Sequence, residues 1–455
     1  MIGSNRNAVR KHGYNAFMLF QRRNNLRWLW VLIPILILIL IGSGIAFTRG
    51  QPVITNIFPP PNMVAVPGLA PIQISFSRAM NPEAVEQGLT IEPDQPGEFV
   101  WEENTLAFTP TDPWPGGAVI SVALGTGART SLGIPLAEEQ VWSFTVARTM
   151  LAYLWPANGP ANLYMLDPVG GAVVQLTEMG GLLEFAVSTN GLLVYFSAYN
   201  ETGGSSLWQL DMLTRESDLV LDCGSDLCSL PQPSPDGQWL VYENTTLGEV
   251  WLLSLENAEP SRLGAGTRPV WSSDGNLVFY DRAGMAFRIV DPAGTILASF
   301  ANQLGEPGAW SPDGNFFAAP ESDAGADSSR LLAFLPINGI VNDLSGDGLV
   351  EDTSPAYSPN GQWLAFARKY LDIERWTPGR QLWVMESDGE NAYPLTNDEF
   401  YTHTSFAWSP NNQQIAFVRA HRTSPGAPPE IWVVNVDGSD PVQLVIGGYS
   451  PQWIP

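Results

Sequence analysis

The chain has 455 residues, of which 45% are apolar and 15% charged, with 43 Gly, 38 Pro, 17 Trp and two Cys. This composition excludes a disordered chain, and the length exceeds what one hydrophobic core usually supports. The net charge of −24 excludes general nucleic-acid binding, and three His leave little room for a His-rich metal site or a Ser-His-Asp triad. Low charge with many turn-forming residues and many Trp favours β structure.

The N-terminal segment has the features of a membrane anchor. Residues 28–47 form an uncharged run that, as a helix of about 30 Å, is long enough to cross a bilayer. Every base of the first 50 residues except Arg49 precedes this run, so the positive-inside rule places the basic tail 1–27 in the cytoplasm. We therefore predict a single-pass protein of the bacterial cytoplasmic membrane with extracytoplasmic C-terminal domains. The alternative is a cleaved signal peptide, because Gly44-Ile45-Ala46 offers small residues.

Residues 52–147 alternate apolar and polar residues in short runs separated by Pro and Gly, which predicts an antiparallel sandwich of immunoglobulin size. Characteristic strings are Ile72-Gln73-Ile74-Ser75-Phe76, Leu89-Thr90-Ile91, Leu106-Ala107-Phe108 and the closing Phe144. With these strings the stretch resembles the bacterial Ig-like domains of the S-layer (SbsA) type. The resemblance implies that this domain is a spacer. Its role would be to present another domain, and it would have no chemistry of its own.

The rest of the chain, residues 149–455, contains a repeat. A Ser-x-Asp/Asn-Gly string, preceded in several copies by Trp or Tyr, begins at Ser234, Ser272, Ser311 and Ser358, with a variant at Ser409 and a weaker copy at Ser188. Successive copies are 46, 38, 39, 47 and 51 residues apart, near the roughly 40 to 50 residues of a four-stranded propeller blade. Asp or Asn followed by Gly suits a hairpin turn, because Gly takes positive φ.

Six units start with this turn, whereas residues 150–177 supply strands without an opening turn and residues 448–455 supply little more than one strand. We therefore predict seven blades, with the last segment completing the first blade and removing exposed edges; six blades is the alternative.

The repeats resemble the TolB-like, WD40-like (PD40) propellers of bacterial envelope proteins. The predicted fold class is thus all-β, an Ig-like sandwich plus a propeller. Such a propeller does not specify a function.

Two local features invite a chemical interpretation. Cys223 and Cys228 lie close together in the predicted exported part, which predicts a local disulfide, and without a nearby His they make a poor zinc site. Residues 342–352 have the acidic character of a calcium loop. The final bidentate Glu is missing, and Leu344 precedes Ser358 by the 14 residues that separate Leu395 from Ser409. We interpret this segment as a blade connection and predict no cofactor, with calcium as the alternative.

A candidate binding patch lies in two loops that propeller geometry places on one face. Residues 368–381 and 419–430 contain six of the propeller's twelve bases. The candidate residues are Arg368, Lys369, Tyr370, Arg375, Trp376, Arg380, Arg419, His421 and Arg422. Arg clusters suit carboxylate or phosphate groups, which predicts an anionic partner. The alternative is that Asp372, Glu374 and Glu430 neutralise the bases on a solvated face.

The predicted function is therefore that of a membrane-anchored, extracytoplasmic binding or scaffold protein for an envelope protein or a cell-wall glycan. No Gly-x-Ser-x-Gly string accompanies the repeats, as a propeller peptidase would require, and no catalytic residues are predicted. The alternative from another class is a glycosidase-like hydrolase that uses two carboxylates in the propeller channel.

Overall fold

The computed structural model describes residues 51–64, 66–322, 328–346, 348–424 and 426–454. The predicted cytoplasmic tail 1–27 and membrane helix 28–47 lie outside these ranges. Within them, no helix has the length and the apolar character needed to cross a membrane.

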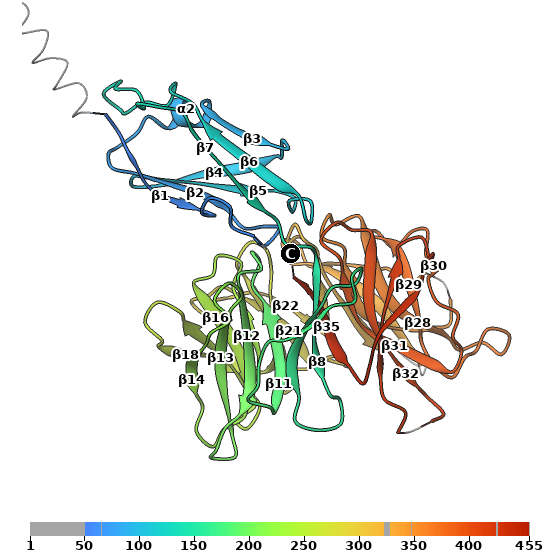
Figure 1. Ribbon diagram of the computed structural model, residues 1–455. Helices are drawn as coiled ribbons and strands as arrows, with labels where there is room; N and C mark the ends of the chain where they lie inside the picture. The colour runs from blue at the N-terminus through green and yellow to red at the C-terminus, as the bar shows by residue number, and fades with distance from the viewer. Residues whose placement is uncertain (1–50, 65, 323–327, 347, 425, 455) are drawn as a thin grey trace, which may run out of the picture.

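The N-terminal domain is a sandwich of two antiparallel sheets (Figure 1). The first sheet has the order β1 (Ile54–Phe58), β2 (Ile72–Phe76), β5 (Thr105–Pro110), β4 (Gly97–Glu102), and the second has the order β3 (Leu89–Glu92), β6 (Val119–Leu124), β7 (Gln140–Thr145). Their inward-facing residues, among them Ile72 and Phe144, form one buried core, to which Trp114 of the connection between β5 and β6 contributes. One short helix, α2 (Pro82–Glu86), begins where the Asn81 side chain accepts a hydrogen bond from the Ala84 N–H at 3.0 Å.

The remaining residues form antiparallel meanders of four strands. Five of these are separate sheets. The first has the order β10 (Val173–Gln175), β9 (Asn162–Leu166), β8 (Met150–Trp155), β35 (Tyr449–Ile454), so it joins the two ends of the array. In the other four the strands follow one another in chain order. They are β11 (Leu182–Val187), β12 (Leu193–Tyr199), β13 (Ser205–Asp211), β14 (Ser217–Asp222); β15 (Cys228–Pro233), β16 (Trp239–Asn244), β17 (Glu249–Ser254), β18 (Pro260–Ala265); β19 (Thr267–Trp271), β20 (Leu277–Asp281), β21 (Ala286–Val290), β22 (Ile296–Ala301); and β31 (Tyr401–Trp408), β32 (Gln414–His421), β33 (Glu430–Asn435), β34 (Val442–Ile446).

The sixth sheet contains eight strands. These are β23 (Ala309–Trp310), β24 (Phe317–Ser322), β25 (Ser329–Leu335), β26 (Ile340–Asp343), β27 (Val350–Tyr357), β28 (Trp363–Tyr370), β29 (Gln381–Glu386) and β30 (Tyr393–Pro394). It consists of two antiparallel meanders that one parallel pair, Ser329 with Glu351, joins into a single sheet. The sequence predicts two separate blades here, so this junction is a departure from the expectation.

The sheets stand side by side around a common axis, as Figure 1 shows, and form a β-propeller. The inner strands β11, β15, β19, β23, β27, β31 and β35 contact one another in that order, and β35 also contacts β11. The C-terminal strand β35 pairs antiparallel with β8, with Trp453 opposite Leu151 and Ile454 opposite Met150. The pairing of the last segment with the first strand of the array is as the sequence predicts.

The repeated sequence features have specific roles in this architecture. In each Ser-x-Asp/Asn string the Ser hydroxyl donates to the carboxylate or amide oxygen two residues later, as from Ser234 to Asp236 at 2.5 Å and from Ser358 to Asn360 at 2.7 Å. Four tryptophans connect neighbouring sheets, because each indole N–H donates to a backbone oxygen of an adjacent inner strand. The donor and acceptor residues are Trp271 and Gln232, Trp310 and Val270, Trp408 and Ala356, and Trp453 and Ala407.

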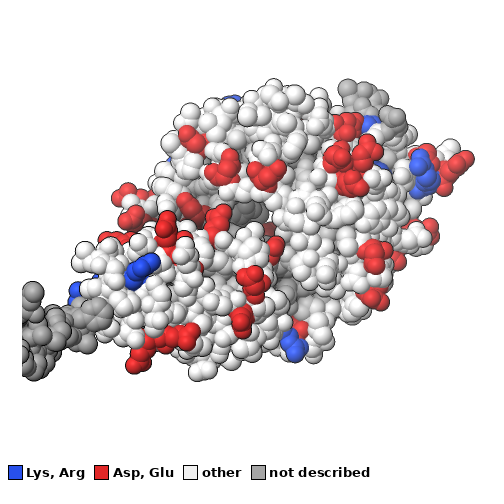
Figure 2. All heavy atoms as spheres, turned by 90° about the horizontal axis from the view of Figure 1, so that it is seen from above, with Lys and Arg blue, Asp and Glu red and all other residues white. Residues whose placement is uncertain are grey.

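The sandwich lies at one end of the propeller, against the Ser-x-Asp/Asn turns (Figure 1). Residues 109–111, with Leu69 and Pro71, line a cavity together with the turns at residues 188–190 and 233–237. Seen from above, this side of the molecule carries scattered acidic side chains and few basic ones (Figure 2), in agreement with the net charge of −24.

Candidate functional site

The candidate binding residues lie on the opposite face of the propeller, where β28 is connected to β29 and β32 to β33. We call the residues 371–380, 398–403 and 419–424 the loop face. Backbone hydrogen bonds hold its segments together, from the Arg422 N–H to the Phe400 oxygen at 2.8 Å and from the His403 N–H to the Arg380 oxygen at 3.0 Å.

Arg368 is not available to a partner, contrary to the sequence prediction. It lies inside β28, opposite Asp352 on β27, and only 6% of its surface is exposed. Its Nε and Nη2 atoms donate to the two Asp352 carboxylate oxygens at 2.8 and 2.6 Å, and Nη2 also donates to the Ser345 backbone oxygen at 3.0 Å. Asp352 is itself fully buried, so this pair fixes the base of the loop face rather than its surface.

The first loop is closed by contacts between its own side chains. Arg375 pairs with Asp372 at 2.6 Å, and its guanidinium lies 3.7 Å from the centre of the Tyr370 ring. The Lys369 ammonium lies 4.9 Å from the centre of the Trp376 ring. Ile373, at the tip, is 99% exposed and Trp376 is 53% exposed. The loop therefore presents apolar groups, while its cations are engaged with an acid and with aromatic rings.

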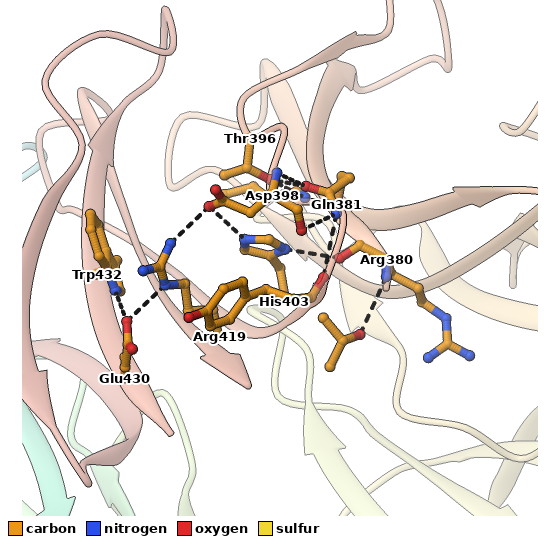
Figure 3. Close-up of polar contacts among 11 residues, drawn as sticks. Arg380, Gln381, Thr396, Asp398, His403, Arg419, Glu430 and Trp432 are labelled. Atoms are coloured by element: carbon orange, nitrogen blue, oxygen red, sulfur yellow. Dashed lines mark hydrogen bonds and ion pairs between the residues drawn. The ribbon is translucent and has the colours of Figure 1, made fainter. Parts of the chain in front are cut away.

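Arg419 contacts two acids and two aromatic rings at the loop face (Figure 3). Its guanidinium lies between the rings of Tyr401 and Trp432, at 4.2 and 3.9 Å from their centres. Its Nη1 and Nε atoms donate to Asp398 and Glu430, each at 2.8 Å. The neighbouring His403 and Arg419 lower the pKa of the Asp398 carboxyl. Because its two charged partners are acids, Arg419 offers little to an anionic ligand.

Arg380, His421 and Arg422 complete the predicted set. Arg380 forms an ion pair with Glu351. The His421 ring packs edge-on against Tyr401, with ring centres 4.8 Å apart. Arg422 is exposed, and within the part of the chain that the structure describes its guanidinium has no hydrogen bond or ion pair.

Sequence reasoning missed the buried polar residues beneath this face. His403 is fully buried, and its Nδ1 lies 2.9 Å from the Arg380 backbone oxygen. Its Nε2 atom faces Asp398 at 3.9 Å, a distance suited to an ion pair and too long for a hydrogen bond. Gln381 holds the same segment, because its side-chain oxygen accepts the Asp398 N–H at 2.7 Å and its amide donates to the Asp398 backbone oxygen at 2.9 Å. No spacing in the sequence indicates these contacts.

Several cations of the predicted patch have acidic partners within the chain, and for Asp372 and Glu430 this agrees with the alternative interpretation of the sequence. Lys369 lies over the Trp376 ring instead, and Arg422 has no ion pair among the described residues. What the loop face offers to a partner is apolar and aromatic surface: Ile373, Trp376 and Phe400, which is 46% exposed.

The other two chemical features have structural roles. Cys223 and Cys228 are joined by a disulfide, with Cα atoms 6.3 Å apart. In the segment 342–352, arginines occupy the oxygens that a cation would need, because Arg330 binds Asp343 and the Gly346 oxygen, and Arg368 binds Asp352 and the Ser345 oxygen. Among the residues with a described position, no three His, Cys, Asp or Glu side chains converge as a metal site.

Comparison with known proteins supports the assignment of the N-terminal domain. Residues 48–146 match a family model described as a bacterial Ig-like domain. No curated protein matches the sequence.

Among solved structures, TolB from Acinetobacter baumannii is 15% identical over 81% of this chain and 83% of its own, with a TM-score of 0.43. A putative TolB from Agrobacterium tumefaciens is 22% identical over 53% of this chain and 89% of its own, with a TM-score of 0.40. The β-propeller domain of the Trilobed protease from Pyrococcus furiosus is 12% identical over 58% of this chain and 82% of its own, with a TM-score of 0.45. These likenesses carry no information on the function of this chain.

Proposed function

We propose that this protein is a membrane-anchored binding protein of the bacterial envelope, and that its loop face captures a protein partner. The observation that carries the proposal is the exposure of Ile373, Trp376 and Phe400 above the buried Arg368–Asp352 ion pair. Exposed apolar side chains on rigid supports are typical of interaction sites, because little conformational entropy is lost when they bind.

A pair of matched variants tests this proposal. Ile373 is 99% exposed on the loop face, and Ile337 is 92% exposed in the turn after β25, on the face that carries the Ser-x-Asp/Asn turns. The full chain and the two variants Ile373→Ser and Ile337→Ser are immobilised, and the retention of envelope proteins is compared band by band by mass spectrometry. We expect a band that Ile373→Ser loses and Ile337→Ser keeps. Equal retention by both variants contradicts a protein site on the loop face.

A cell-wall glycan is the alternative partner. Arg375 and Arg422 are both exposed bases of the loop face. An anionic glycan needs these two cations, so we expect Arg375→Ala and Arg422→Ala to lower its binding. Binding of a protein that contacts Ile373 is instead expected to be lost in Ile373→Ser. Binding of purified cell-wall polymers to the variants separates these two outcomes.

The membrane anchor is proposed from residues 28–47 and the basic residues before them. Cell fractionation tests it: an anchored protein stays with the membranes after alkaline extraction, whereas a chain released by signal peptidase is found in the soluble envelope fraction.

We also propose that the propeller has seven blades. Five separate four-stranded sheets and the two meanders of the eight-stranded sheet support this count, and so does the cycle of contacts among the inner strands. An electron-microscopy map of the protein viewed along the propeller axis distinguishes seven blades from six.

A glycosidase-like hydrolase is the second candidate function, because Glu184 and Glu243 line one cavity at the inner strands. Chromogenic glycosides provide the assay. Turnover that disappears in both Glu184→Gln and Glu243→Gln favours this function, and the absence of turnover by the unmodified chain counts against it.

A further inference from the structure

The cavity that contains Glu184 is separate from the loop face and lies among three other sheets. It has a volume of about 400 Å³ and opens where β11, β15 and β19 begin, at the end of the propeller away from the Ser-x-Asp/Asn turns. Small-molecule sites in proteins usually measure about 300 to 1,000 Å³. Its lining combines charged, hydroxyl and apolar side chains, which is the composition of a binding site rather than of a packing defect.

Arg268 enters this cavity from a β-bulge of β19. Its φ is +57°, at the point where the register of β19 against β20 shifts. The same bulge with a positive φ recurs on other inner strands, at Leu230, Ser354, Ser405 and Ser450. Two bonds hold the residue there. Its backbone N–H donates to a carboxylate oxygen of Glu243 at 3.0 Å, and its guanidinium donates to the Gly305 backbone oxygen. Glu243 is only 5% exposed, so the carboxylate that positions Arg268 is itself fixed.

A second arginine lines the cavity without an internal partner. Arg282 follows β20 and is exposed, and among the described residues its guanidinium forms no hydrogen bond or ion pair. The two arginines share the cavity with two glutamates, Glu184 and Glu243. Glu243 accepts the Arg268 N–H, and burial raises the pKa of Glu184, which disfavours its charged form. The exposed Arg282 guanidinium is therefore the group of this cavity that is placed to meet an anion.

The neutral part of the lining indicates what else the ligand carries. Ser229, Thr245 and Thr267 line the cavity, and Tyr199, which is 60% exposed, stands at the same cavity. The Thr245 hydroxyl donates to the Leu227 backbone oxygen at 3.0 Å, which leaves it as an acceptor. Hydroxyl groups both donate and accept hydrogen bonds, so they match the hydroxyls of a sugar. The apolar lining residues are Leu183, Leu227 and Leu230, which suit the C–H groups on one face of a sugar ring.

We propose that this cavity binds a small acidic sugar, whose carboxylate is held by Arg268 and Arg282 and whose hydroxyls meet Ser229, Thr245 and Thr267. A planar guanidinium binds a carboxylate through two parallel hydrogen bonds, which makes Arg the suitable residue for this task. The same carboxylate chemistry is present at the C-terminus of a peptide, and the experiment distinguishes these two sources.

Isothermal titration calorimetry on the full chain tests the proposal with three probes: glucuronate, glucose, and an acetylated tripeptide with a free C-terminus. We expect glucuronate to bind and glucose to bind at least about tenfold more weakly, because a charge-assisted hydrogen bond is lost. Equal affinity for glucuronate and glucose, or no binding of glucuronate, overturns the proposal. If the tripeptide binds and glucuronate does not, the assignment of the ligand as a sugar is wrong, and the cavity is a site for a peptide carboxylate.

Two variants identify the site. Arg282→Gln is expected to weaken glucuronate binding by about tenfold to a hundredfold, and because this side chain makes no contact that supports the fold, the variant is expected to fold normally. Arg268→Gln is expected to have at least the same effect. Arg129→Gln, an exposed position in the sandwich, is the control and is expected to leave the affinity unchanged. Unchanged affinity in Arg282→Gln contradicts the assignment of the cavity, whatever the behaviour of Arg268→Gln.

Discussion

Replacing Asp352 by Ala is the perturbation with the largest predicted effect on stability. The substitution removes both carboxylate partners of Arg368, and it also removes the acceptor of the Ser345 hydroxyl at 2.7 Å. The guanidinium then stays 94% buried, with the Ser345 backbone oxygen and the rings of Phe366 and Trp383 as its remaining neighbours. Breaking a buried pair in this way costs about 3–5 kcal/mol, because one charge is left uncompensated.

A matched exposed pair provides the control for this prediction. Arg375 and Asp372 are also 2.6 Å apart, but 54% and 30% of their side-chain surfaces are accessible. Removing Asp372 should therefore cost about 1 kcal/mol or less. Urea unfolding of the two variants, followed by tryptophan fluorescence, measures both costs. Equal losses in Asp352→Ala and Asp372→Ala would refute the argument that burial, rather than distance, sets the value of these ion pairs.

Two further predictions concern pH and the disulfide. Burial raises the pKa of Glu184 above its ordinary value of 4.5. Between the pKa of the unfolded chain and the higher pKa of the folded state, only the folded state still binds the proton. The free energy of unfolding therefore falls as the pH rises through this interval. Glu184→Gln should therefore raise the melting temperature at neutral pH and leave it unchanged well below pH 4.5; a gain of equal size at both pH values would contradict this assignment. Replacing Cys223 and Cys228 together by Ser opens a loop with a sequence separation of 5 and should cost about 2 kcal/mol. Thermal unfolding under non-reducing conditions checks this value, and an unchanged transition contradicts it.

Most of the fold follows from sequence features that act locally. The Ser-x-Asp/Asn strings predict turns because their hydrogen bonds are made within five residues, as from the Trp239 N–H to Ser234 Oγ at 3.0 Å. The pairing of β35 with β8 follows from counting strands, since the first sheet lacks one and the last segment supplies one. The parallel pair that joins two meanders, Ser329 with Glu351, has no local signal, because it depends on how closely neighbouring sheets approach.

The candidate site was less predictable because its contacts are distant in the sequence. Arg368 follows an apolar strand and has the appearance of a loop residue, yet β28 continues through it and its partner Asp352 lies on another strand. Both faces of β28 are buried, so no alternation of polar and apolar residues distinguishes the position. Arg268 was not predictable for a different reason, since its contact with Glu243 joins two neighbouring sheets and no spacing in the sequence indicates it.

Closure of the propeller by the C-terminal strand is the central structural claim, and a cross-link between β8 and β35 tests it most directly. Met150 and Ile454 are opposite one another in the register of these strands, and opposed residues of an antiparallel pair have Cα atoms about 4.5–5.5 Å apart, within the range of a disulfide. Both residues are replaced by Cys, and the protein is oxidised and digested. Non-reducing mass spectrometry should then find the peptide that contains residue 150 linked to the peptide that contains residue 454, alongside the native Cys223–Cys228 bond. A chain in which the native disulfide has formed, but both introduced thiols still react with an alkylating reagent, would contradict the closed architecture.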